Sequence, residues 1–333
     1  MTFGDRLGRE QELALHFDDS PRTRYRATWN FTIHLKLLLR LIARLPLGAT
    51  HALGAFLGRA VYMLSPRYRN RVLENLGSSG LCPNREALHA LARSNAAEIG
   101  KGAAELAWAL FRPLGEIAAM MKARDGWDAV ERLKAGGKPM IFVTPHLGGY
   151  EMMGRYLYDV LPGFLIAMYR PHKLDWFERM IREGRDRGSG PDSTHTATAS
   201  IAGVRKVLKH MQAGGGTFML PDQVPGLGDG EWAEFFGRPA YTMTLVGRLQ
   251  QASGAAIVFC FAERLPDAGG FIAHFRVLEE TLPHDRHEAT LRVNQGIEEL
   301  VRMCPVQYLW GYNRYKRPAG APPPPAQTLR SLS

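Results

Sequence analysis

The residues best suited to chemistry are a histidine and a glutamate five positions apart, His146 and Glu151. They flank the point where an apolar run, 139–144, gives way to a glycine pair and then to a helix-like pattern. The run predicts a buried strand, which Pro145 ends because proline cannot donate to a strand ladder. Since His146 precedes the predicted helix, its imidazole and the Glu151 carboxylate can converge. A histidine oriented by a carboxylate is suited to general base catalysis near neutral pH.

Three further residues are candidates for binding substrate near this pair: two arginines suited to anionic groups, and an aspartate suited to the acceptor or to bracing the arginines. Arg170 follows a predicted strand, Arg185 lies in the last turn of an arginine-rich helix predicted over 174–187, and Asp222 follows a predicted strand at 217–220. Ligand sites of α/β sheets usually form where parallel strands end. Each residue also has a structural interpretation: a salt bridge beside a helix, a solvated basic face, and a turn-forming aspartate. The residues alone leave both interpretations open.

The elements that must position these groups alternate between strand and helix after residue 126. This pattern predicts an α/β fold, a layered mixed sheet flanked by helices. The predicted strands are 139–144, 164–169, 217–220, 255–262 and 271–278. The predicted helices are 127–135, 150–160, 174–187, 201–213, 241–252 and 286–303.

The chain before residue 126 reads as helical and suggests contact with a membrane surface. In the helix predicted over 31–45, Lys36, Arg40 and Arg44 recur every fourth position among leucines, so they share one face. Such a helix can lie in a membrane interface with its bases near lipid phosphates. Two helices of a soluble bundle are the alternative, and a true span is less favoured because of the three bases.

These patterns give four predicted regions. A polar arm covers 1–28, a helical membrane-proximal region 29–125, the α/β domain 126–318, and a proline-rich disordered tail 319–333. The N-terminal arm has no apolar run of the kind found in signal peptides.

Composition narrows the choice of partners. The chain has 333 residues, with 42 basic against 32 acidic side chains. This excess favours acidic partners such as an anionic membrane surface, and no nucleic-acid-binding motif accompanies it. The three cysteines are widely spaced, which predicts no disulfide framework and no metal site.

Five blocks in order resemble the lipid A biosynthesis acyltransferases, a bacterial family of lauroyl and myristoyl transferases. The first is His-Leu-Gly-Gly-Tyr-Glu at 146–151, similar to the family's His-x4-Glu motif and to the His-x4-Asp motif of glycerolipid acyltransferases. The family usually has Gly-Asn-Trp where this chain has Gly-Gly-Tyr. The other blocks are Tyr-Arg-Pro at 169–171, Glu-Gly-Arg at 183–185, Pro-Asp-Gln at 221–223 with Phe-Phe-Gly-Arg-Pro at 235–239, and Gln-Tyr-Leu-Trp at 307–310.

The resemblance implies a glycerolipid acyltransferase-like fold and transfer of a fatty acyl chain to a lipid hydroxyl. The donor would be an acyl carrier protein or CoA thioester, and the acceptor a lipid A precursor. His146 would be the general base oriented by Glu151, while Arg170, Arg185 and Asp222 would bind substrate. No metal, cofactor or covalent acyl-enzyme is needed. The expected location is the cytoplasmic face of the bacterial inner membrane, peripheral or monotopic. Alternatives are a different lipid acceptor, or a catalytically silent membrane-binding relative.

Overall fold

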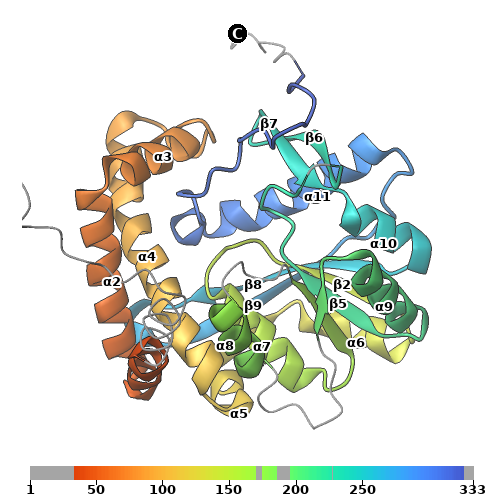
Figure 1. The fold of residues 1–333 in the computed structure, drawn as a ribbon, viewed down its shortest axis with the longest axis horizontal. Helices are drawn as coiled ribbons and strands as arrows, with labels where there is room; N and C mark the ends of the chain where they lie inside the picture. Colours follow the sequence, from red (N-terminus) through yellow and green to blue (C-terminus); the bar gives the residue numbers. More distant parts are fainter. Residues whose placement is uncertain (1–33, 170–174, 186–195, 227, 326–333) are drawn as a thin grey trace, which may run out of the picture.

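The computed structural model describes residues 34–169, 175–185, 196–226 and 228–325. It has the predicted α/β architecture, with a central sheet between layers of helices (Figure 1). Arg170 lies outside the described residues, and so does the side chain of Arg185. The predicted arm, 1–28, also lies outside them.

The central sheet has seven strands in the order β1-β9-β8-β2-β5-β3-β4. All neighbouring pairs are parallel except β8 and β9, which are antiparallel. A separate antiparallel hairpin joins β6 and β7. The strands are β1 (Met121–Asp125), β2 (Met140–Val143), β3 (Leu165–Tyr169), β4 (Thr196–Thr198), β5 (Gly216–Met219), β6 (Gly230–Phe235), β7 (Arg238–Met243), β8 (Ala256–Arg264) and β9 (Phe271–Val277).

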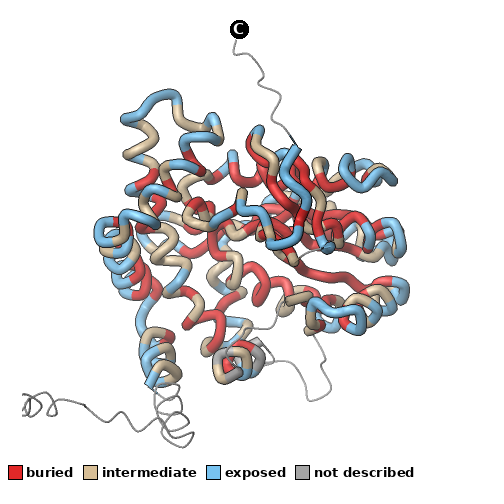
Figure 2. The backbone as a smooth tube through the Cα atoms, turned by 45° about the horizontal axis from the view of Figure 1, so that its top comes forward, coloured by how far each residue is buried: buried red, intermediate tan, exposed pale blue. Residues whose placement is uncertain are grey.

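The central strands are buried on both faces, which explains their continuous apolar sequences. In β2, Ile141 and Val143 pack into one cluster with helices α9 to α11, while Met140 and Phe142 pack into a second cluster with α6 and α7. Figure 2 shows the central strands mostly buried, whereas much of the exposed surface lies on the outer turns of the helices and on loops. The helices here are α5 (Leu114–Ala118), α6 (Trp127–Ala135), α7 (Tyr150–Val160), α8 (Asp175–Arg185), α9 (Ile201–Gln212), α10 (Leu245–Ser253) and α11 (Arg286–Met303).

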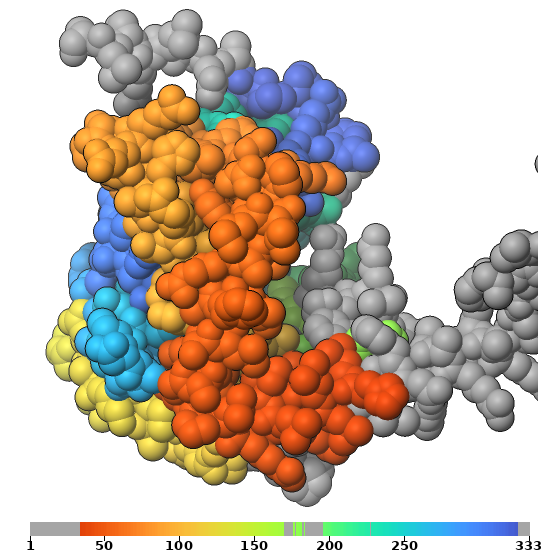
Figure 3. Space-filling model, turned by 90° about the vertical axis from the view of Figure 1, so that its left-hand side faces the viewer, coloured from red at the N-terminus to blue at the C-terminus, as the bar shows by residue number. Residues whose placement is uncertain are grey.

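The N-terminal helices stand against one end of this sandwich. Residues 34–44 are helical, and α2 (Leu47–Leu64), α3 (Pro66–Gly77) and α4 (Arg85–Phe111) follow. Glycines bring α2 and α4 into backbone contact: a Cβ on Gly54 or Gly58 would lie 2.5 or 2.1 Å from a carbonyl oxygen of α4. Small residues allow such close helix approach. The outer side of α2 forms a face of the molecule (Figure 3).

Three parts of the fold differ from the sequence expectation, and the shortest is β4 (Thr196–Thr198), which lies where no element was predicted. Residues 121–125, within the predicted helical region, form β1, which pairs with β9 from the far end of the chain. The hairpin of β6 and β7 was not predicted, and it takes the first residues of the helix predicted over 241–252. The formation of β1 depends on a pairing partner distant in the sequence. The hairpin depends on its turn, Phe236-Gly237, in which both residues have positive φ.

Candidate active site

The site forms where two neighbouring parallel strands end. Strands β2 and β5 pair with Val143 opposite Met219. His146 lies three residues beyond Val143, and Asp222 lies three residues beyond Met219. Each strand is stopped by a proline, Pro145 and Pro221, one residue before the polar side chain. The register of the sheet therefore brings His146 and Asp222 side by side.

His146 and Asp222 are joined by two hydrogen bonds. The backbone N–H of His146 donates to Oδ2 of Asp222 at 2.9 Å, and the imidazole Nδ1 lies 2.7 Å from Oδ1. Asp222 is buried, and the His146 side chain is 14% exposed. An ionised carboxylate only accepts hydrogen bonds, so Nδ1 carries a proton and Nε2 of the neutral ring is left as the basic atom. Nε2 faces the side-chain amide nitrogen of Gln223 at 3.1 Å.

The two groups shift each other's pKa in opposite directions. Burial opposes the charged form of His146, but the charge and hydrogen bond of Asp222, with the nearby charge of Glu151, outweigh it and raise the pKa of the imidazole. Burial also opposes ionisation of Asp222, yet His146 and the more distant Arg314 hold the pKa of this carboxyl below its usual range. The site thus favours a carboxylate beside an imidazole that readily takes a proton.

The turn that carries His146 is fixed through its backbone. Leu309 N–H donates to His146 O at 3.1 Å, Gly148 N–H to Gln307 O at 3.2 Å, and Gly149 N–H to Ala262 O at 2.8 Å. Gly148 has φ +59°, and a Cβ there would lie 2.1 Å from Ala262 O. Only glycine fits this conformation and this approach to β8.

The spacing in the sequence suggests Glu151 as the carboxylate that orients His146. Glu151 lies in the first turn of α7, where its charge raises the pKa of His146. The hydrogen-bond partners of the two ring nitrogens are Asp222 and Gln223. The geometry therefore gives the orienting contact to Asp222. The position of Glu151 suits electrostatic support of a protonated imidazole.

Three residues at this site have no role assigned from the sequence. Gln223 faces the basic nitrogen, and the buried Tyr308 lies by Asp222, whose charge adds to burial in raising the pKa of this phenol. Arg314 is buried and donates to Tyr241 O at 2.9 Å and to the hydroxyl of Thr242. Gln223 could have been found from the sequence, because it adjoins Asp222 after the same strand.

Other chemistries find little support among the described residues. No group of three or more His, Cys, Asp or Glu side chains is placed there to hold a metal ion. Cys260 and Cys304 are buried, and burial raises the pKa of both thiols, Cys304 to about 12. Neither is therefore poised as a thiolate nucleophile.

An exposed apolar surface covers the outer side of the N-terminal helices. No helix within the described ranges is both long and apolar enough to cross a membrane. Beside this surface lies a cleft of about 330 Å³, lined by Arg40, Ala43, Arg44, Phe111 and Arg112. The surface consists of large side chains between 36% and 81% exposed: Leu37, Leu38, Leu41, Leu45, Leu53, Phe56, Leu57, Val61, Met63 and Leu64.

Comparison with known proteins identifies the family. Residues 18–317 match the bacterial lipid A biosynthesis acyltransferases, and the chain belongs to this family. It is 27% identical over 198 residues to a lipid A biosynthesis palmitoleoyltransferase of Escherichia coli K12, covering 59% of this chain and 62% of the relative. It is 25% identical over 291 residues to the lauroyltransferase of that organism, covering 86% and 91%.

A lipid A biosynthesis acyltransferase of Haemophilus influenzae is 26% identical over 189 residues, 56% of each chain. The chain thus aligns with about three fifths of the palmitoleoyltransferase and of the Haemophilus relative, and with nearly the whole lauroyltransferase. The resemblance inferred from the five blocks is confirmed at the level of the family.

Proposed function

We propose that this protein transfers a fatty acyl chain from a thioester donor to a hydroxyl of a lipid A precursor. The observation that carries the proposal is the pairing of His146 with Asp222 at the strand ends, which leaves Nε2 as a base within a chain of this family. The relatives are named for palmitoleoyl, lauroyl and myristoyl transfer. Acyl carrier protein is the proposed donor, with acyl-CoA as the alternative.

In the proposed reaction, the acceptor hydroxyl displaces the Gln223 amide from Nε2 of His146. As the hydroxyl oxygen attacks the thioester carbonyl, Nε2 takes its proton and the imidazole becomes positively charged. Asp222 holds the ring through Nδ1, and the charge of Glu151 stabilises the imidazolium. The C–S bond then breaks, and the leaving thiolate takes the proton from Nε2. The new ester bond forms without an acyl-enzyme.

Substrate binding by the two arginines remains part of the proposal. Arg185 ends α8, and Arg170 follows β3, whose neighbour β5 leads to Asp222. Guanidinium groups suit the phosphates of a lipid A precursor or of a phosphopantetheine arm. Asp222, which the sequence suggested as a binding residue, we instead assign to holding His146.

We also propose that the protein lies on the cytoplasmic face of the inner membrane without crossing it. The exposed apolar surface of residues 37–64 would enter the acyl boundary, as amphipathic helices do. Arg40 and Arg44, which line the neighbouring cleft, would contact lipid phosphates at about 1 kcal/mol for each base. The acceptor would then reach His146 without leaving the bilayer.

Acyl transfer by purified protein tests the proposed activity. Wild-type protein should move label from acyl-acyl carrier protein to a lipid A precursor, and His146→Ala should abolish transfer while the protein stays folded. Loss of a general base lowers rates by roughly 10²–10⁴-fold. Equal turnover by His146→Ala would contradict the assignment of the base. Turnover with another lipid, but not with the lipid A precursor, would move the assignment to that acceptor.

A further inference from the structure

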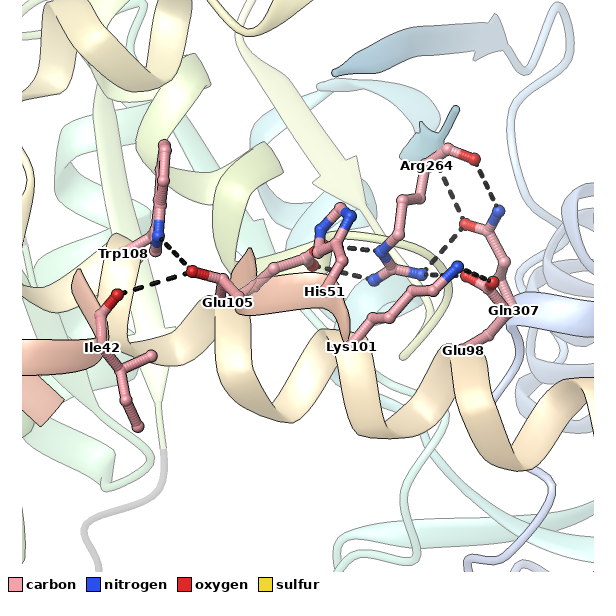
Figure 4. Close-up of polar contacts among 9 residues, drawn as sticks. Ile42, His51, Glu98, Lys101, Glu105, Trp108, Arg264 and Gln307 are labelled. Atoms are coloured by element: carbon pink, nitrogen blue, oxygen red, sulfur yellow. Dashed lines mark hydrogen bonds and ion pairs between the residues drawn. The ribbon is translucent and has the colours of Figure 1, made fainter. Parts of the chain in front are cut away.

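A buried polar cluster lies behind the active-site turn, outside the residues that the proposed reaction uses. It joins α2, α4, the end of β8 and the short helix η2 (Pro305–Gln307) (Figure 4). The guanidinium of Arg264 donates to both oxygens of Glu105 at 2.6 and 2.8 Å, and to Glu98 at 2.9 Å. Lys101 donates to Glu98 at 2.5 Å. Two carboxylates are thereby matched by two cations.

The centre of the cluster is almost wholly removed from water. The side chains of Arg264 and Glu105 are each 1% exposed. His51 of α2, 6% exposed, places its Nε2 2.6 Å from the same Glu105 oxygen that accepts from Arg264 Nε. Buried ion pairs add little stability over well-packed apolar side chains of similar volume, although they require a defined geometry. Stability alone therefore gives a weak reason for the arrangement.

The cluster reaches the active-site turn through Gln307. The side chain of Gln307 pairs with the backbone of Arg264: its Oε1 accepts from Arg264 N–H at 2.9 Å, and its Nε2 donates to Arg264 O at 2.8 Å. The backbone oxygen of Gln307 accepts from Gly148 N–H, and Leu309 N–H donates to His146 O. Segment 307–309 is thus held by Arg264 on one side and holds the histidine turn on the other.

Helix α4 also packs directly beneath the turn. A Cβ on Gly102 would lie 3.3 Å from Arg264 Nη2 and 3.8 Å from Gly148 O. A Cβ on Gly149 would lie 3.4 Å from Glu105 Oε2. The ion-pair cluster and the turn that carries His146 therefore both lie against the same part of α4.

We propose that Arg264 and Gln307 are positioning residues for acyl transfer, which fix the Gly148 turn and so hold His146 against Asp222. The inference depends on the proposed function only for its predicted effect on the rate of acyl transfer. Glu105 and Glu98 set the place of the guanidinium, and Gln307 carries that placement to the turn backbone. Loss of the linkage leaves all reacting groups present but loosens the contact between His146 and Asp222.

The experiment uses Gln307→Met, which keeps the volume of the side chain and leaves every charge of the cluster paired. It removes the two bonds to the Arg264 backbone and a longer one, at 3.4 Å, from Arg264 Nη1. We expect kcat to fall roughly tenfold or more with little change in KM, since small misplacements of a catalytic group are costly. The acid limb of the pH–rate profile should move to lower pH by about half a unit or more as the Asp222 contact weakens. Arg264→Lys keeps the positive charge but loses the bidentate contact of the guanidinium with Glu105, and it should have the same effects.

The matched control is Gln250→Met in α10. Gln250 is also buried, and its Oε1 accepts from the backbone of Leu282 at 3.0 Å, away from the site. It should lower the melting temperature while kcat per folded molecule and the acid limb stay as in wild type. If Gln307→Met changes only the melting temperature, as the control does, the positioning role is wrong.

An NMR titration of His146 separates this inference from the proposed activity. The imidazole signal, assigned by its absence in His146→Ala, reports the pKa without any turnover. A lower pKa in Gln307→Met than in wild type supports positioning even where acyl transfer fails with every substrate tried. An unchanged titration in an active enzyme overturns the positioning role and leaves the proposed function standing.

Discussion

At the scale of single residues, the site depends on the different roles of the two ring nitrogens of His146. Nδ1 is bound to Asp222, which is buried and held ionised, so the ring cannot rotate freely. Nε2 is then the only atom of the ring available to a substrate, and Gln223 shows where such a group would sit. Because Asp222 and Glu151 both raise the pKa of His146, the base is stronger than a free imidazole but requires a higher pH to be unprotonated.

The pH dependence of the reaction follows from this shift. General base catalysis needs neutral His146, so kcat/KM should rise with pH through a pKa above the ordinary value of about 6.5. In Asp222→Asn the attraction that raises the pKa is lost, and the acid limb should move to lower pH. The rate at the plateau should also fall by roughly 10²–10⁴-fold, because the ring is no longer held. A pH–rate series on both proteins measures the two effects, and an unmoved limb would contradict the pairing.

Stability should vary with pH for the same reason. The raised pKa of His146 stabilises the folded protein below about pH 6.5, and this contribution is lost as pH rises through the folded-state pKa. The lowered pKa of Asp222 stabilises above about pH 3.9, and this is lost as pH falls through its folded-state pKa. The destabilisation of His146→Ala should therefore be largest near pH 5–6 and smaller near pH 9 in thermal unfolding. A pH-independent difference would argue against the ion pair.

At the scale of elements, most helices and five strands, β2, β3, β5, β8 and β9, were predictable from local patterns, while the partner of His146 was not. The run at 139–144 and the proline after it placed His146 at a strand end, and the pattern at 217–220 did the same for Asp222. What brings them together is the register of β2 with β5, which pairs residues 76 positions apart. Glu151 is close in sequence, and that closeness suggested the orienting role that the geometry gives to Asp222.

The turn at Gly148 is the element most sensitive to substitution. Gly148→Ala should destabilise the protein by more than the ~1–2 kcal/mol of a left-handed alanine, because the new Cβ would also collide with Ala262 O. Activity per folded molecule should drop as the His146 turn shifts. Chemical denaturation and single-turnover acyl transfer measure the two effects.

Gly163→Ala is the matched control for this substitution. Gly163 also has a positive φ, +72°, but a Cβ there meets nothing within 4 Å. It should cost only about 1–2 kcal/mol and leave turnover unchanged. Equal losses of stability at the two positions would show that backbone strain, and not the close approach to β8, dominates the effect at Gly148.

At the scale of the whole molecule, one face differs from the rest. The described exposed large apolar side chains gather on residues 37–64, apart from Ile201 and Met303 elsewhere. Lys36 of the basic stripe pairs with Glu183 at 2.7 Å, so Arg40 and Arg44 are the bases that we expect to contact lipid. A large exposed apolar patch with bases at its margin is typical of a membrane-interacting surface.

Vesicle binding tests this surface. Replacing Phe56 and Leu64 together by serine should weaken binding to anionic vesicles by about 1.5–3 kcal/mol for each side chain. Ile201→Ser, which removes a side chain 74% exposed on α9, is the control and should bind as wild type does. Arg40→Glu with Arg44→Glu should weaken binding to anionic vesicles most at low salt, because screening reduces the difference from wild type as salt rises. Binding unaffected by all of these changes would place the membrane contact elsewhere.

The glycine-lined crossing of α2 and α4 gives this surface a fixed relation to the site. Backbone contact at Gly54 and Gly58 leaves the two helices no room to slide, and α4 in turn packs under the turn that carries His146. The distance from the exposed apolar side of α2 to Nε2 of His146 is therefore fixed by the fold. A protein seated in the headgroup layer would hold its base at one depth, and reach only those hydroxyls that a lipid presents at that level. The choice of acceptor would then depend partly on the depth at which each lipid hydroxyl lies in the membrane.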